Sequence, residues 1–71
     1  MTHMNNITIG KNIKYYRKQS SMTLEEVGEV IGVSKQCLCS WEHGRNMPSA
    51  IALYRMAKIF KVNMEDFFTR E

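Results

Sequence analysis

The chain has 71 residues, which is enough for one domain with a single hydrophobic core and too few for a second domain. Its net charge is a modest +3, and its apolar stretches are far too short to span a membrane. Two cysteines, Cys37 and Cys39, are too few for a disulfide framework, and residues 1–6 lack the basic and then apolar pattern of a secretory signal. We therefore expect a soluble, reduced, cytoplasmic protein with one domain over residues 1–71.

The first predicted helix covers about Thr8 to Ser20. Ile9, Ile13 and Tyr16 recur there at i, i+4 and i+7, with polar and basic residues between them. Residues 1–6 precede the helix and are expected to be flexible, so the core is expected over about residues 9–68.

The second predicted helix begins at Leu24 and ends at Gly32. Thr23, followed three residues later by Glu26, forms a capping box, in which the Thr oxygen accepts from a free amide and the Glu side chain reaches back to the Thr amide. Glycine suits the left-handed conformation that closes a helix, so Gly32 is expected to end this one.

The third predicted helix follows almost at once. Only Val33 precedes Ser34, a favourable N-cap, and residues from Lys35 to His43 then form a helix that ends at Gly44. Two short helices joined by such a tight turn must cross steeply.

A fourth helix and a short last one complete the predicted fold. Residues 45–48 form a loop, and Pro48 with Ser49 opens the fourth helix. Its inward face is expected to carry Ala50, Leu53, Met56, Ala57 and Phe60. Asn63 is expected to cap a last helix over residues 64–68. The sequence has no strand pattern, so we predict an all-α fold, a compact bundle of four or five helices.

The segment over residues 24–44 meets the demands of a helix-turn-helix. Such a motif needs a small residue where the two helices touch, a glycine at the turn and apolar residues at inward positions, and Gly28 and Gly32 meet the first two demands. The inward set is Val27, Ile31, Val33, Leu38 and Trp41. Because glycine inside a helix is disfavoured by roughly 0.5–1 kcal/mol relative to alanine, close packing is the expected reason for Gly28.

With these features the chain resembles the phage-repressor and Cro-like helix-turn-helix family, also called the Xre family, over about residues 9–68. The similar segments are I-G-K-N-I-K-Y-Y-R-K, M-T-L-E-E-V, G-V-S, W-E-H-G-R-N-M-P-S and V-N-M-E-D-F. Each is weak alone, and together they are highly specific. The resemblance implies a lambda-repressor-like DNA-binding domain that binds a double-stranded DNA operator, usually as a two-fold homodimer.

The resemblance also implies that the third helix contacts base edges in the major groove through Lys35, Gln36 and Ser40. The chemistry agrees at the first two, because glutamine can bind adenine through two hydrogen bonds and lysine can reach guanine O6 or N7. A phosphate contact alone remains an alternative for Lys35, and a solvated side chain remains one for Gln36. Cys39 lies at a peripheral position, and Cys37 is expected to pack against the bundle.

Phosphate contacts are expected from the free amides at the starts of the second and fourth helices, from Thr23, and from the loop residues Arg45 and Asn46. The family most often has glutamine where this chain has Leu24, so a side-chain contact to phosphate is expected to be missing there. The Leu24 amide can still donate.

Arg17 and Glu42 match a pair that forms a partly buried salt bridge between the first and third helices of the family. The resemblance therefore assigns both residues to structure rather than to DNA.

The charge distribution agrees with a nucleic-acid partner without requiring one. Lys and Arg gather in residues 1–23 and 34–61, whereas residues 25–29 carry three glutamates. This asymmetry suits a basic face toward a polyanion, but solvated helices often show it too.

The leading interpretation is a sequence-specific DNA-binding transcriptional regulator. A repressor is favoured over an activator because no residues remain for a separate effector module. The end of the fourth helix, with Phe67 and Phe68, is the first candidate for the dimer contact.

The alternative is an antitoxin or another protein-interaction module on the same fold, although the sequence lacks the flexible tail that often wraps a toxin. An enzyme is not expected, since the sequence has no catalytic arrangement of Ser, His, Asp or Cys and no phosphate-binding glycine loop. We expect no cofactor, no small-molecule substrate and no metal, because Cys37, Cys39 and His43 lack the two-part spacing of a zinc site.

Overall fold

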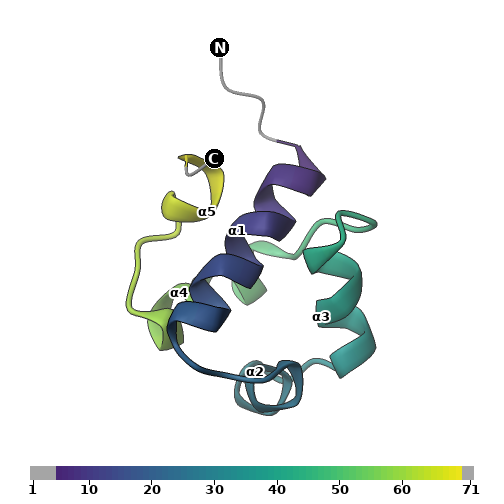
Figure 1. Ribbon diagram of the computed structural model, residues 1–71, viewed down its shortest axis with the longest axis vertical. Coiled ribbons are helices and arrows are strands. Elements are labelled where there is room, and N and C mark those ends of the chain that lie inside the picture. The colour runs from purple at the N-terminus through teal and green to yellow at the C-terminus, as the bar shows by residue number, and fades with distance from the viewer. Residues whose placement is uncertain (1–4, 70–71) are drawn as a thin grey trace.

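Five helices and no strand make up residues 5–69, the part of the chain that the computed structural model describes. They are α1 (Asn6–Gln19), α2 (Leu24–Ile31), α3 (Lys35–Glu42), α4 (Ala50–Phe60) and α5 (Asp66–Thr69). Figure 1 shows α1 in the centre, with α3 and α5 on opposite sides of it, α2 below and α4 behind. The predicted all-α fold is confirmed.

One hydrophobic core joins all five helices. Its fully buried side chains are Ile9, Ile13, Val27, Leu38, Met56 and Phe67. Burying such a side chain contributes about 1.5–3 kcal/mol. Helices as short as α2 and α3 are marginal alone in water, so this shared core is what stabilises them.

The first four helices each begin at a polar side chain that accepts a hydrogen bond from a backbone amide three residues on. These caps are Asn5, Thr23, Ser34 and Ser49. The predicted starts of α2 and α3 are therefore confirmed. Asn5 caps α1 and Asn6 begins it, so this helix starts two residues before the predicted Thr8. Of the segment predicted to be flexible, residues 1–4 lie outside the described residues.

A residue in the left-handed conformation follows each of the first four helices. These residues are Ser21, Gly32, Gly44 and Lys61, with φ of 55°, 83°, 76° and 60°. The two glycines lie where the sequence predicts them, because glycine adopts this conformation without strain. The left-handed conformation of Ser21 and Lys61 could not be predicted from the sequence, since residues other than glycine rarely adopt it.

The fourth and fifth helices differ from the prediction in three details. Ala52 is buried in place of Ala50, which is exposed. Pro48 precedes the cap and stays in the loop. The Asn63 side chain does not cap the last helix as predicted; instead the Asn63 backbone amide donates to the Asp66 carboxylate at 2.9 Å. The helix α5 begins at Asp66, two residues later than predicted.

Gly28 lies where α2 touches the turn before α3. A Cβ on residue 28 would lie 2.5 Å from the carbonyl oxygen of Val33, so any side chain would push the turn away. The close packing predicted for Gly28 is confirmed. The predicted inward set is buried as well, except that Val33 is half-buried against the core.

Candidate nucleic-acid interface

The helix-turn-helix consists of α2, α3 and the three residues between them. In Figure 1 α2 is seen almost end on and α3 from the side, so the two helices cross steeply, as the short turn predicts. The Val33 amide closes the turn by donating to the Gly28 carbonyl at 3.0 Å. The Ser34 hydroxyl then caps α3 by accepting from the Cys37 amide at 3.1 Å.

The helix α3 has an inner and an outer face. Leu38 and Trp41 form the inner face and are buried in the core. The outer face carries Lys35 and Gln36, which are exposed, and Ser40, which is half-buried. The three side chains that the sequence predicts to contact bases therefore lie on the accessible side of the helix.

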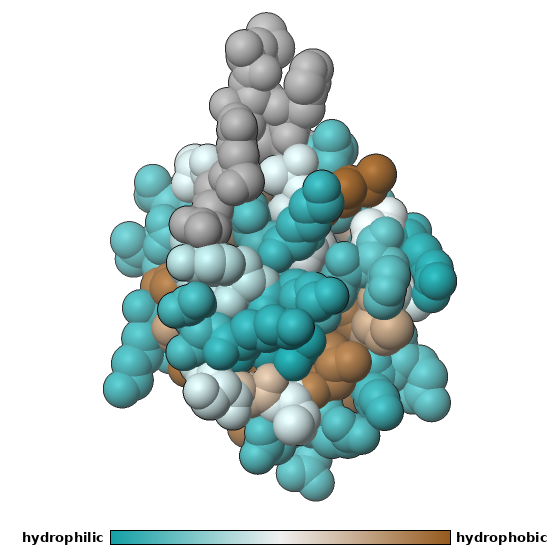
Figure 2. Space-filling view, viewed as in Figure 1, coloured by the Kyte–Doolittle hydropathy of each residue, from teal (hydrophilic) through white to brown (hydrophobic). Residues whose placement is uncertain are grey.

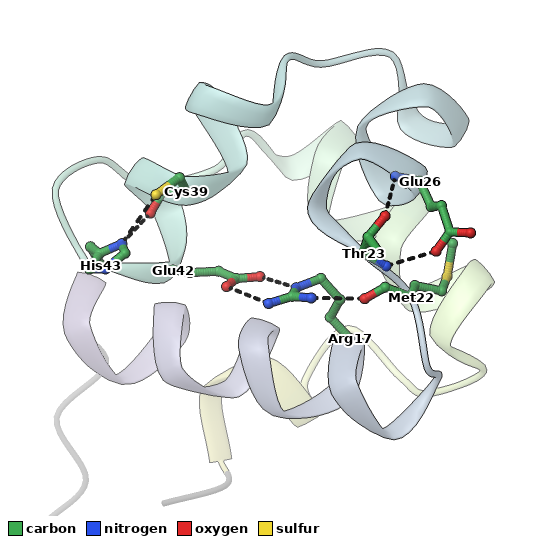
Figure 3. Close-up of polar contacts among 7 residues, drawn as sticks. All are labelled: Arg17, Met22, Thr23, Glu26, Cys39, Glu42 and His43. Carbon is green, nitrogen blue, oxygen red and sulfur yellow. Dashed lines mark hydrogen bonds and ion pairs between the residues drawn. The ribbon is translucent and has the colours of Figure 1, made fainter.

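A partly buried ion pair fixes the end of α3 to α1. Arg17 Nε donates to Glu42 Oε2 at 2.7 Å and Arg17 Nη2 donates to Glu42 Oε1 at 3.2 Å. The two side chains are only 11% and 5% exposed. The same guanidinium donates to the Met22 carbonyl at 2.8 Å, so one side chain joins α1, α3 and the segment before α2 (Figure 3).

A second ion pair, on the surface, joins the two helices of the motif. Lys35 Nζ lies 3.2 Å from the Oε2 atom of Glu25, and the side chains are 55% and 63% exposed. The pKa of Glu25 is lowered from its ordinary value by a hydrogen bond from its own backbone and by the charge and hydrogen bond of Lys35. Sequence reasoning missed Glu25, because ten residues and a turn separate it from Lys35.

Two backbone amides at the start of α2 are already hydrogen-bonded by side chains of the same segment. The Thr23 amide donates to the Glu26 carboxylate at 2.8 Å, and the Thr23 hydroxyl oxygen accepts from the Glu26 amide at 3.1 Å (Figure 3). The Thr23 hydroxyl keeps its hydrogen for donation. Leu24 is half-buried against the core, and its amide, at the first helical position, has no acceptor within the helix.

The loop between α3 and α4 presents a basic side chain and an amide to solvent. Arg45 and Asn46 are both exposed. The Arg45 amide donates to the Ser40 carbonyl at 2.9 Å, which ties the start of the loop to the end of α3. Both predicted loop residues are therefore accessible next to the third helix.

His43 ends α3 and lies beside Cys39. Its Nδ1 atom is 2.8 Å from the Cys39 carbonyl oxygen and 3.5 Å from the Cys39 sulfur (Figure 3). Cys37 packs against the core, as predicted. Across residues 5–69, no three His, Cys, Asp or Glu residues form a group that could hold a metal ion.

The basic residues of α1 differ from Arg55 of α4 in what they contact. Lys11, Lys14 and Lys18 are exposed on α1. Figure 2 shows one face of the molecule, and hydrophilic residues cover most of it. Arg55 of α4 instead donates from Nη1 to the Ile31 carbonyl at 3.1 Å, so it closes the end of α2. None of the helices described in the structure is long and apolar enough to cross a bilayer.

Comparison with known proteins identifies the family. A family model described as helix-turn-helix matches residues 13–67. An uncharacterized HTH-type transcriptional regulator of Methanocaldococcus jannaschii is 37% identical over 59 residues, which are 83% of this chain and 89% of the relative. The chain belongs to the helix-turn-helix family of transcriptional regulators, and the predicted resemblance to phage-repressor and Cro-like proteins is confirmed.

Solved structures that resemble this one include two complexes with DNA. The structure of SinR, the master regulator for biofilm formation, in complex with DNA has a TM-score of 0.76 and 33% identity, and the match covers 83% of this chain and 95% of the chain in that structure. The structure of the P22 c2 repressor protein in complex with a synthetic operator has a TM-score of 0.81 and 21% identity, and the match covers 89% of this chain and 96% of the chain in that structure. The second comparison shows a shared fold alone.

Proposed function

We propose that this chain is a sequence-specific repressor that inserts α3 into the major groove of an operator. The observation that carries the proposal is the contrast between the two faces of α3. Leu38 and Trp41 hold the helix in the core, while Lys35 and Gln36 are exposed at its start. The first residues of a recognition helix are the ones that contact base edges.

The exposed side chains suit direct base recognition. Gln36 can accept from and donate to the N6 and N7 edge of adenine, and Lys35 can donate to guanine O6 or N7. Ser40 lies one turn further along the same face and can donate to or accept from either kind of base. The relative SinR, in which the same fold was solved in complex with DNA, supports this role.

Phosphates would be held around this helix by groups that the structure leaves accessible. We assign this role to the Thr23 hydroxyl, the Leu24 amide, and the side chains of Arg45 and Asn46. The amides of the first turn of α4 add to them, since helix starts favour anions. Repression needs no further activity, because a protein bound to an operator blocks access to it.

A homodimer is part of the proposal, because a two-fold operator needs two copies of α3. Phe67 cannot supply the contact that the sequence suggests, since it is fully buried. Exposed apolar surface on α4 is instead provided by Tyr54, in the middle of the helix, which is 53% exposed. Sedimentation of the free chain and of the DNA complex measures the stoichiometry directly.

Selection from random duplexes tests the proposed function. We expect a shared two-fold motif whose half-sites lie about 10–10.5 bp apart, or a multiple of that distance. Recovery of no shared motif would contradict the proposal, and so would binding without sequence preference that disappears at moderate salt.

Substitutions then separate base contacts from phosphate contacts. Gln36→Ala should weaken binding by about 1–3 kcal/mol and relax the preference at one base pair. Arg45→Ala should weaken binding to all sequences alike and reduce the salt dependence by about 0.9 in the log-log slope. Unchanged affinity and preference in Gln36→Ala would show that the outer face of α3 is not the recognition surface.

A further inference from the structure

The lysine that begins the recognition helix is already paired inside the motif. Lys35 Nζ lies 3.2 Å from the Glu25 carboxylate. Two neighbours of Glu25 on α2 are engaged elsewhere, because Leu24 packs against the core and the Glu26 side chain accepts from the Thr23 amide. Glu25 is therefore the side chain from the start of α2 that reaches α3.

We propose that Glu25 is a specificity-determining residue that makes Lys35 a contact to bases rather than to phosphates. The inference rests on the proposed function, since it concerns how that function discriminates among DNA sequences.

The physical reason is the charge of the acceptor. A lysine ammonium has three donors, so Lys35 can keep its bond to Glu25 while donating to a neutral guanine O6 or N7. A phosphate that replaced the base would bring a second anion next to the Glu25 carboxylate, and like charges at such distances repel. The ion pair therefore penalises phosphate contacts and leaves contacts to bases available.

The ion pair is also weak enough for Lys35 to leave Glu25 when DNA is bound. Both side chains are more than half exposed, so water screens their attraction and Lys35 can turn toward DNA without unfolding any structure. An unpaired lysine at this position would bind any nearby phosphate, and phosphates are present in every sequence. Removing Glu25 should therefore strengthen nonspecific binding more than specific binding.

The decisive variant is Glu25→Gln, which keeps the shape of the side chain and removes its charge. Its matched control is Glu29→Gln, one turn further along α2, because Glu29 is also exposed and forms no ion pair within residues 5–69. Affinities are measured at several salt concentrations for two probes. One is the duplex recovered by random selection, and the other is a duplex of the same length and composition with its sequence scrambled.

Glu25→Gln should raise affinity for the scrambled duplex about two- to fivefold more than Glu29→Gln does. The log-log salt slope for that duplex should steepen by about 0.9, as expected for one additional phosphate contact. The ratio of the two affinities should fall by the same two- to fivefold, whereas Glu29→Gln should leave that ratio unchanged. In a Lys35→Gln background the two glutamate variants should behave alike.

Three results would overturn the inference. Glu25→Gln could strengthen both duplexes equally, it could weaken only the selected duplex, or it could keep its effect after Lys35→Gln. Failure of the proposed function would look different, because the unchanged chain would then bind both duplexes equally well.

A measurement without DNA tests the pair itself. Titration of the Glu25 carboxyl by NMR should give a pKa below the ordinary value for Glu, and Lys35→Gln should raise that pKa. An unchanged pKa in Lys35→Gln would show that the pair is absent in solution, and the inference would fail even if the chain still prefers its operator.

Discussion

The side chains on the two faces of α3 differ greatly in how tightly the rest of the protein holds them. On the inner face Leu38 and Trp41 are buried, and Glu42 is bound by the guanidinium of Arg17. On the outer face Gln36 is exposed, and Lys35 pairs with a carboxylate that is itself exposed. The position of the helix and its recognition chemistry are thus encoded by different residues, so each should be changeable without the other.

Gly10 offers the strongest way to break the inner face. A Cβ on residue 10 would overlap the carbonyl oxygen of Trp41 and lie 2.8 Å from that of Glu42, and these backbone atoms cannot turn aside. Gly10→Ala should destabilise the fold by about 3 kcal/mol, because α1 must move away from α3. Urea unfolding measures the loss. The neighbouring exposed variant Lys11→Ala should stay within about 0.5 kcal/mol of the unchanged chain, and an equally small effect at Gly10 would contradict the contact.

Glu42→Gln removes the charge that compensates Arg17. We expect a loss of about 2–3 kcal/mol, somewhat below that of a fully buried pair because the Arg17 side chain retains some contact with water. Thermal unfolding provides the measurement. The double variant Arg17→Met with Glu42→Leu leaves no unpaired charge, so it should be destabilised by less than the sum of the single variants Arg17→Met and Glu42→Leu. If the losses in unfolding free energy were strictly additive, Arg17 and Glu42 would not stabilise each other.

Lys61→Gly should stabilise the chain without touching either face of α3. Lys61 ends α4 with a φ of 60°, a conformation that glycine adopts without strain. We expect a gain of about 0.5–1 kcal/mol, since relief of strain exceeds the added freedom of the unfolded chain. A higher unfolding midpoint with unchanged DNA preference would make this variant a suitable background for the others. A lower midpoint would contradict the expected relief.

Gln36→Ala provides the smallest expected effect on stability and the sharpest contrast with the inner face. Its side chain is exposed, so the free energy of unfolding should change by less than about 0.5 kcal/mol. Circular dichroism during unfolding checks this on the same sample used for DNA binding. A loss of more than about 1 kcal/mol would show that the two faces are not independent.

The helix-turn-helix was the part of the fold that the sequence predicted best. Thr23 and Ser34 cap helices through amides three residues away, so their effect is local and visible in the sequence. The last helix was predicted less well, because Asn63 and Asp66 can each serve as a cap and the choice between them depends on how the segment packs.

The candidate site, like the fold, was only partly predictable from the sequence. Lys35 and Gln36 follow from their place after the turn, and their exposure agrees with that prediction. Their roles toward DNA stay predictions. The partner of Lys35 was not predictable, because the sequence does not show which of the seven acidic residues lies near it in space, and a surface pair of this kind contributes little to stability.

The sequence by itself determined the helices, the turn at Gly32 and the family, because caps, glycines and apolar spacing act within a few residues of chain. Only the tertiary structure decided which groups meet across it. It brings Glu25 to Lys35 and fits Gly10 against the carbonyl of Trp41. It also lets the buried Asn12 side chain donate from Nδ2 to the backbone carbonyl of Phe67 at 2.6 Å. These contacts depend on how the helices cross, and packing of the shared core sets that crossing.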